Sequence, residues 1–304
     1  MKVIDIHPIT QTGTNSKEHF VDGRPCFSPD GNTVLFERTG KGIPRAQFWT
    51  VDIQTNSENP YYKSDTYGCL RASWTWNPTT GLPQIAFTGI YPEGDNPTSR
   101  VMLLDENGAD NSATHLTVPG YQDAQLSYPA WYPNEPALLM TNYSQLELLK
   151  VNIISLKSSV LTPNNYWSGM GTLNRANPKI IAYAGQTKGS GAYHQKINKV
   201  LLQVGQNNPV VFSDPAKGTI GRTPWFSPDG NIMAFEAYST QPKLQIFLKK
   251  VDLANPNTPI IHVKGPSSPA QHPKFSPDGS RLVWAQNDGQ GKTQIYMGTV
   301  SMDD

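Results

Sequence analysis

Short segments of alternating apolar and polar residues, separated by turn residues, run along the whole chain. Thr33–Glu37 and Arg281–Ala285 are clear examples, with the period of two that is typical of half-buried strands. The 25 glycines and 26 prolines are spread over the full length instead of being gathered in one linker. This pattern predicts many short antiparallel strands joined by tight turns, and the lack of a helical period argues against a parallel α/β fold.

A five-residue word, Phe-Ser-Pro-Asp-Gly, occurs three times, at residues 27–31, 226–230 and 275–279. In each copy a proline stands two residues before the phenylalanine, and another aromatic residue stands nine after it. Serine can start a type I turn, proline presets φ at the next position, and glycine supplies the positive φ at the end. We therefore assign a structural role in tight hairpin turns to Ser28, Asp30, Gly31, Ser227, Asp229, Gly230, Ser276, Asp278 and Gly279.

Trp74, Trp131 and Leu173 anchor three degenerate copies of the same unit. The six anchors are on average about 50 residues apart, a period that suits one four-stranded propeller blade. We expect an all-β fold, a single six-bladed β-propeller domain of four-stranded antiparallel blades over residues 1–304. The repeat units lie near residues 24–64, 71–120, 128–164, 169–215, 223–265 and 272–302. The last unit is one strand short, so we expect residues 3–10 to join the last blade and close the ring.

The repeated words resemble the WD40-like (PD40) repeats of the TolB-like β-propellers. The features that carry the resemblance are the proline before each word and the following Gln-Ile-Phe or Gln-Ile-Tyr, at 245–247 and 294–296. The resemblance covers residues 20 to 302 and has no counterpart of the separate N-terminal domain of TolB. It implies a docking surface, because the TolB propeller receives its partner protein at the mouth of the central channel. Prolyl oligopeptidases and metal-binding oligogalacturonate lyases contain related propellers, so the fold is better indicated than the activity.

The mouth of the channel is where strand ends from every blade converge, and propellers bind ligands there. The residue before each repeat proline, or its equivalent, enters the innermost strand near this mouth. We expect a ring of Arg24, Arg71, Tyr128, Gly169, Thr223 and His272, with Arg222 and Gln271 beside it. Arginine and tyrosine are frequent in binding hot spots. The alternative is that these side chains form local salt bridges or hold channel water.

Motifs for catalysis or cofactor binding are absent from the sequence. It contains no G-x-S-x-G elbow, no H-E-x-x-H, no C-x-x-C pair and no phosphate loop, and we interpret the glycine-rich residues 185–191 as a hairpin. Among the histidines only His272 falls near the channel. The other five fall on outermost strands or between strands: His7, His19, His115, His194 and His262. We therefore expect no metal site and no cofactor.

The two cysteines give little information about the cellular compartment of the protein. Cys26 and Cys69 are offset by four residues relative to their anchors on neighbouring inner strands, which is about 13 Å. A disulfide needs its Cα atoms within about 7 Å, so we expect two free thiols.

Charged residues make up 16% of the chain, and the formal net charge is +1. These values argue against binding to phosphate backbones or anionic lipid surfaces, so we expect no nucleic acid partner and no membrane insertion. Residues 1–8 read as a strand and not as a signal peptide, because Asp5 and Pro8 interrupt any apolar centre. Low charge with abundant Asn, Gln, Ser and Thr favours a periplasmic or secreted protein whose leader has been removed, with the cytoplasm as the alternative.

The leading hypothesis is a monomeric, non-enzymatic scaffold that docks a protein or peptide partner at the channel mouth. Replacing both Arg24 and Arg71 by alanine should then abolish partner binding and leave thermal stability nearly unchanged. The second hypothesis is a carbohydrate-active or carbohydrate-binding propeller, either a lectin or a metal-dependent lyase with a metal near Gln271 and His272. A toxin antagonist or host-directed scaffold is a third hypothesis, and the sequence does not distinguish it from the first.

Overall fold

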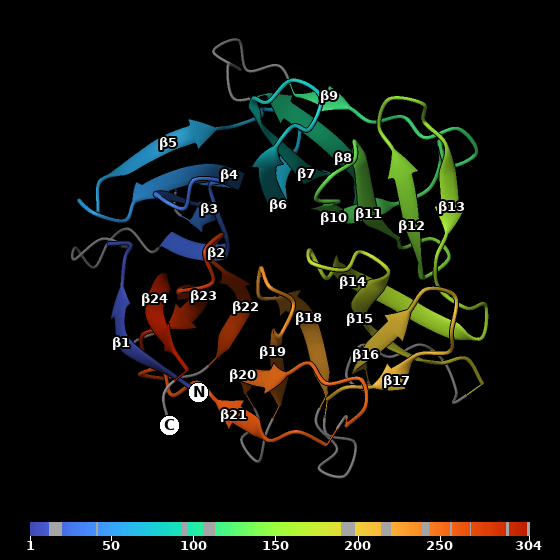
Figure 1. Cartoon of the computed structure of the whole chain (residues 1–304). Coiled ribbons are helices and arrows are strands. Elements are labelled where there is room, and N and C mark those ends of the chain that lie inside the picture. Colours follow the sequence, from blue (N-terminus) through green and yellow to red (C-terminus); the bar gives the residue numbers. More distant parts are fainter. Residues whose placement is uncertain are drawn as a thin grey trace.

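The computed structural model describes residues 1–11, 20–40, 42–92, 97–105, 113–189, 198–213, 220–238, 243–255, 257–267, 269–289 and 292–302. Every regular element within these residues is a β-strand, and no helix there is long and apolar enough to span a membrane. The strands form four separate sheets of four strands and one sheet of eight. These sheets stand around a common centre (Figure 1). The fold is therefore an all-β propeller with four-stranded blades.

Each four-stranded sheet takes four consecutive strands of the chain, paired in chain order. The first holds β6 (Gly68–Trp76), β7 (Pro83–Tyr91), β8 (Thr98–Asp105) and β9 (Thr114–His115). The second holds β10 (Leu126–Trp131), β11 (Ala137–Asn142), β12 (Glu147–Asn152) and β13 (Ser158–Val160). The third holds β14 (Tyr166–Leu173), β15 (Ile180–Thr187), β16 (Lys199–Val204) and β17 (Val210–Val211). The fourth holds β18 (Gly221–Phe226), β19 (Ile232–Tyr238), β20 (Leu244–Lys250) and β21 (Ile260–His262).

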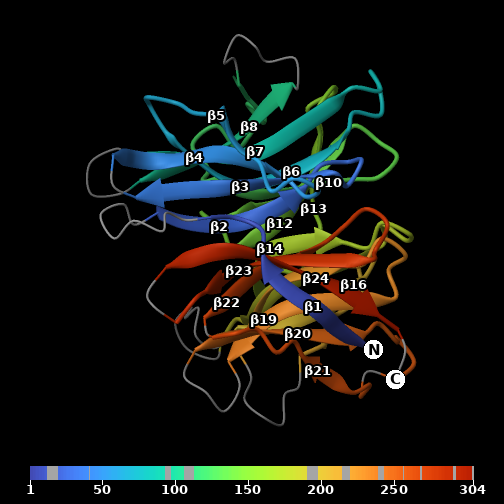
Figure 2. The same ribbon diagram turned by 90° about the vertical axis from the view of Figure 1, so that its left-hand side faces the viewer.

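The eight-stranded sheet joins the two ends of the chain. It contains β2 (Phe20–Phe27), β3 (Thr33–Gly40), β4 (Ile43–Asp52) and β5 (Glu58–Tyr62), together with β22 (Ala270–Phe275), β23 (Arg281–Asn287), β24 (Thr293–Ser301) and β1 (Lys2–Pro8). The two halves touch through one parallel pairing, of Val21 with Thr293. As expected from the sequence, the N-terminal strand β1 lies antiparallel to β24. The two chain ends consequently lie close together (Figures 1 and 2).

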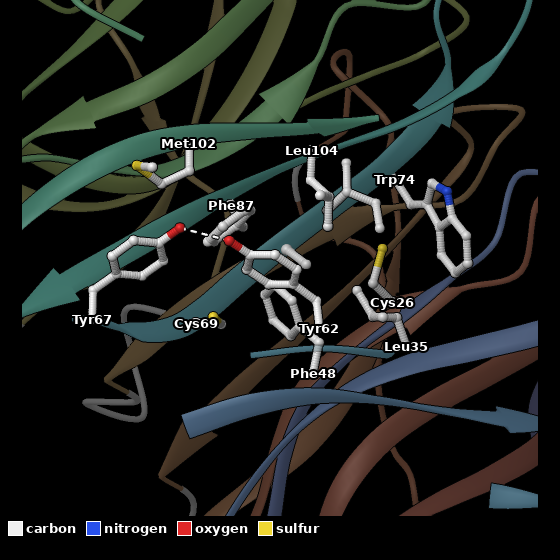
Figure 3. Close-up of a cluster of buried hydrophobic side chains, with 12 residues drawn as sticks. Cys26, Leu35, Phe48, Tyr62, Tyr67, Cys69, Trp74, Phe87, Met102 and Leu104 are labelled. Atoms are coloured by element: carbon white, nitrogen blue, oxygen red, sulfur yellow. Dashed lines mark hydrogen bonds between the residues drawn. The ribbon is translucent and has the colours of Figure 1, made fainter. Parts of the chain in front are cut away.

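The core consists of hydrophobic clusters that lie between successive groups of strands. In the cluster between β2–β5 and β6–β8, the ring of Phe87 meets Phe48 edge-on at a centroid distance of 5.2 Å (Figure 3). A further cluster packs β23 and β24 against β2–β4, so the two halves of the eight-stranded sheet also face one another as neighbouring blades do. Alternation along each strand therefore supplies apolar side chains to two clusters, one on each face.

The three repeated words form turns at one end of the inner hairpins. In the first, the amide of Gly31 donates to the carbonyl of Ser28 at 2.9 Å, and Gly31 has a φ of 76°. The hydroxyl of Ser28 donates to Asp30 at 2.6 Å, and Asp30 accepts the amide of Asn32. These bonds lower the pKa of Asp30. The same carbonyl–amide bond and the same Ser–Asp bond recur in the turns at 227–230 and 276–279, so each carboxylate serves its own turn.

Candidate functional site in the central channel

All six innermost strands are interrupted at the same place. In β2, β6, β10, β14, β18 and β22 the register with the second strand shifts across two residues, which form a bulge. The first residue of each bulge has a positive φ, between 40° and 58°. These residues are Arg24, Arg71, Tyr128, Met170, Thr223 and His272. A left-handed backbone costs a non-glycine residue about 1–2 kcal/mol, and such strain gathers at functional sites.

These six residues surround one cavity of about 50 Å³, which we call the arginine chamber. The structure brings five of the six predicted ring residues to this chamber. In the fourth inner strand it places Met170 there, and Gly169, one residue earlier, pairs with Ala184 before the bulge begins. Met170 lies three residues before the anchor Leu173, as the ring residue does in the other five units, so the bulge keeps the same spacing and Gly169 falls one residue before it.

Side chains of the preceding blade hold four of the strained backbones in place. The amide of Arg71 donates to Glu37 at 2.5 Å, and the amide of His272 donates to Glu236 at 2.8 Å. The amides of Tyr128 and Met170 are held in the same way by the hydroxyls of Thr88 and Thr141. Sequence reasoning missed these four acceptors, although each directly follows the second anchor residue of its unit, at 36, 87, 140 and 235.

Two ion pairs with buried carboxylates lie at or beside the chamber. Arg24 Nη1 lies 2.7 Å from Glu37, and Arg222 Nε bonds to Glu236, whose side chain is fully buried. Burial alone would lower the pKa of Arg24, but the charge of Glu37 raises it overall. Burial raises the pKa of Glu236, and Arg222 opposes that rise. Both carboxylates thus serve two inner strands at once, one through an arginine and one through a backbone amide.

Arg71 differs from these two arginines, because its side chain forms no ion pair with any described residue. Its Nη1 donates to Ser127 at 2.7 Å, and its guanidinium lies 4.3 Å from the ring centroid of Tyr128. Its Nε, like the Nε of Arg24 and the Nδ1 of His272, is buried without a hydrogen-bond partner among the described residues. Buried polar atoms are nearly always bonded, so a group of such atoms at one cavity indicates a place for a polar ligand or for water.

His272 faces the chamber as a neutral ring. Its burial, and then the positive charges of Arg24 and Arg222, lower its pKa well below the ordinary value of 6.5. An uncharged imidazole can accept as well as donate a hydrogen bond. The ring therefore offers a ligand a neutral polar contact beside the positive charge of Arg71.

The remaining predicted site residues lie beside the chamber or away from it. Arg222 and Gln271 do not line the cavity, and Gln271 lies opposite Ala285 in the sheet. Three histidines lie on outer strands, on β1, β9 and β21, whereas His19 and His194 fall outside the described residues. Within the described part of the chain, no three His, Cys, Asp or Glu side chains are grouped to hold a metal ion. Cys26 and Cys69 are both buried and free.

Comparisons with known proteins bear on the fold. No family model and no curated protein matches the sequence. TolB from Acinetobacter baumannii is 14% identical with a TM-score of 0.56, and the match covers 95% of this chain but 56% of that one. A provisionally named TolB from Agrobacterium tumefaciens is 17% identical with a TM-score of 0.59, covering 94% and 92%. The chain folds as a TolB-like β-propeller.

An enzyme has the same fold. An oligogalacturonate lyase from Vibrio parahaemolyticus is 13% identical with a TM-score of 0.57, and the match covers 99% of this chain and 98% of the lyase. Structural matches at identities this low establish the architecture alone. The function must therefore be argued from the channel itself.

Proposed function

We propose that the chain is a six-bladed propeller, closed by β1, that serves as a non-enzymatic scaffold and docks a protein or peptide partner at the mouth of its central channel. Support for the six blades comes from the contacts of the inner strands, each of which touches the inner strand on either side, β22 and β2 included. The cluster between β23–β24 and β2–β4 supports counting the eight-stranded sheet as two blades.

The observation that carries the docking proposal is the arginine chamber. It unites strained backbone from all six inner strands around an arginine that lacks an acidic partner among the described residues. The cavity of about 50 Å³ has room for about four water molecules. A partner therefore inserts one side chain or one chain end, while the rim of the channel meets the rest of its surface. Arg71, Tyr128 and His272 are the residues best placed to hold the inserted group.

The state of the carboxylates supports a binding role over a catalytic one. Glu37 and Glu236, the two acids nearest the chamber, are each engaged by an arginine and a backbone amide. These partners hold both carboxylates in fixed positions, whereas a general base must reach the proton that it removes. We further propose a periplasmic or secreted monomer, which light scattering after gel filtration and cell fractionation would check.

A capture experiment with a single arginine variant tests the docking. Arg71→Gln removes the positive charge without breaking an ion pair, so we expect the folded protein to lose its partner. Arg100→Gln is the matched control, because Arg100 also lies over a tyrosine, 4.8 Å from the ring of Tyr91, but on β8 away from the channel. The partner is identified by mass spectrometry and its affinity measured with both variants. Equal affinity for the wild type and Arg71→Gln would rule out this placement of the partner.

The structure argues against using the double alanine variant of Arg24 and Arg71 that the sequence suggested. Arg24→Ala would leave the buried Glu37 without its arginine, and breaking a buried pair in this way costs about 3–5 kcal/mol. The double variant of Arg24 and Arg71 would therefore lose stability as well as binding, and it does not separate the two effects.

A carbohydrate-active or carbohydrate-binding propeller is the alternative, and the likeness to the oligogalacturonate lyase over the full chain favours it. This alternative requires a saccharide to perturb tryptophan fluorescence, or a divalent cation to bind stoichiometrically near His272. Metal analysis and a glycan panel on the wild type decide between the two functions.

A further inference from the structure

The channel continues beyond the arginine chamber into a second cavity of about 150 Å³, towards the end where the repeated words turn. The same six inner strands line it with the residues that follow their bulges. Trp225 and Lys274 line both cavities and so mark the boundary between them. We call this second cavity the tryptophan chamber, because four of the seven tryptophans line it, namely Trp74, Trp76, Trp131 and Trp225.

Two positively charged side chains line the tryptophan chamber. Lys274 is half-buried on β22, and its Nζ lies 3.0 Å from the ring centroid of Trp225 on the neighbouring inner strand. Arg175 follows the end of β14 and is exposed at the rim. Neither side chain forms a salt bridge with an acidic residue of the described chain. The chamber thus carries two positive charges without a described counter-charge.

The surroundings of Lys274 show how poorly its charge is compensated. Burial lowers its pKa to about 8, and the only group that opposes this shift is the thiol of Cys26. Partial desolvation by the surrounding protein also lowers the pKa of Arg175, although the residue is exposed, and Cys26 is again the only opposing group. A charge in such a position is stabilised most by an anion that enters with its own hydrogen-bond acceptors.

The rim of the chamber supplies an exposed aromatic face. Trp76, at the end of β6, has 49% of its surface exposed although it lines the cavity. A large aromatic side chain left open beside a cavity favours stacking against a ring. The volume has room for about ten water molecules, and so for a compound of about that many non-hydrogen atoms.

We propose that the tryptophan chamber binds a small carboxylate carried on a ring, with the carboxylate against Lys274 and Arg175 and the ring against the tryptophans. This site is separate from the arginine chamber and does not rest on the docking function. The opposite ends of one channel would then hold a partner segment and a small anion.

Phenylacetate and phenylacetamide form a matched pair of probes, because they have the same shape and differ in charge. At pH 7 we expect phenylacetate to change the tryptophan fluorescence in a saturable manner and phenylacetamide to bind about tenfold more weakly. Cyclohexylacetate separates the two kinds of ring, since equal binding would indicate apolar packing and weaker binding would indicate aromatic stacking. Sodium acetate at equal ionic strength controls for a general salt effect.

Variants locate the site. Lys274→Met and Arg175→Gln should each weaken phenylacetate binding about tenfold, whereas Arg71→Gln, in the other chamber, should leave it unchanged. Arg175 is exposed, so its variant keeps the test valid should Lys274→Met fold poorly. Bound phenylacetate should also slow alkylation of Cys26, which lines the chamber, and leave that of Cys69 unaffected.

Binding should weaken as the pH rises through about 8, where Lys274 loses its proton, while Arg175 stays charged and Cys26 stays protonated because its pKa is raised. Lys274→Met should lack this pH dependence. An unsaturable response to phenylacetate, equal binding of phenylacetamide, or unchanged binding in both variants would overturn the proposal.

Discussion

The two chambers of the channel are lined by consecutive residues of the same six strands, yet they differ in how their positively charged side chains are paired with acidic residues. At the arginine chamber, Arg24 and the adjacent Arg222 are matched by the buried carboxylates of Glu37 and Glu236, and Arg71 alone of these three lacks an acidic partner among the described residues. In the tryptophan chamber, Lys274 and Arg175 have no acidic partner among the described residues and face aromatic rings instead.

The difference separates charges that hold the ring together from charges that remain open to a ligand. Glu37 and Glu236 each connect two neighbouring inner strands, so removing one leaves a buried arginine unpaired and an amide without its acceptor. Lys274 connects nothing through a hydrogen bond within the described residues, so removing it leaves no group unsatisfied. Stability and binding can therefore be perturbed independently at the two ends of the channel.

Glu236→Ala should have the largest effect on stability. The change leaves Arg222 without its carboxylate and the amide of His272 without an acceptor, and a broken buried pair costs about 3–5 kcal/mol. Urea unfolding measures this loss as a decrease in the free energy of unfolding. The control is Glu135→Ala, which breaks the partly exposed pair with Lys150 and should cost less than about 1 kcal/mol. Equal losses in both variants would show that the Arg222–Glu236 pair contributes no more to stability than a partly exposed pair.

Lys274→Met should raise the free energy of unfolding at neutral pH, because it removes a half-buried charge, and this gain should shrink as the pH rises above about 8. Between about pH 8 and pH 10.5 the unfolded chain still holds the lysine proton and the folded chain has lost it, so unfolding takes up a proton. The free energy of unfolding of the wild type therefore rises with pH in this window, by at most about 1.4 kcal/mol per pH unit, relative to the variant. Parallel pH profiles of the two proteins would show that Lys274 is solvated as in the unfolded chain.

Thr223→Gly should have the smallest effect of the three, a small increase in the free energy of unfolding. Thr223 is β-branched and has a φ of 46°, a conformation that glycine adopts without strain, so relief should raise the free energy of unfolding by up to about 1 kcal/mol. Thr172→Gly is the matched control from the tryptophan chamber, where the backbone has no positive φ and glycine should instead cost about 0.5–1 kcal/mol. Losses in both variants would argue against strain in the arginine chamber.

Much of the fold could be predicted because the chain repeats itself. Three identical words located the hairpins, and the missing strand of the last unit pointed to residues 3–10, which do pair with β24. The ring position failed only in the fourth unit, where the residue three before the anchor Leu173, the spacing of the other five units, is Met170 and not Gly169. Local turn chemistry is readable from sequence, because it involves neighbouring residues.

The charges of the channel were harder to predict, because pairing depends on side chains brought together by neighbouring blades. Glu37 and Arg71 are 34 residues apart, and the sequence around either residue does not indicate that they form a hydrogen bond. Lys274 and Trp225 occupy equivalent places, each just after a repeat proline, so alignment of the units places them on one level of the channel. Their stacking, however, follows from the distance between inner strands, which the sequence pattern does not encode.

The pairing of β1 with β24 has a consequence for synthesis on the ribosome. Thr10, just after β1, bonds to an amide of β24 that lies 285 residues further along the chain. At about 5–20 residues per second, translation takes about 15–60 s to cover that distance. Throughout this time Val3 and Ile6, which later pack against the last cluster, have no partner strand. Strand β1 thus leaves the ribosome long before β24, and the nascent chain must carry it without this partner until then.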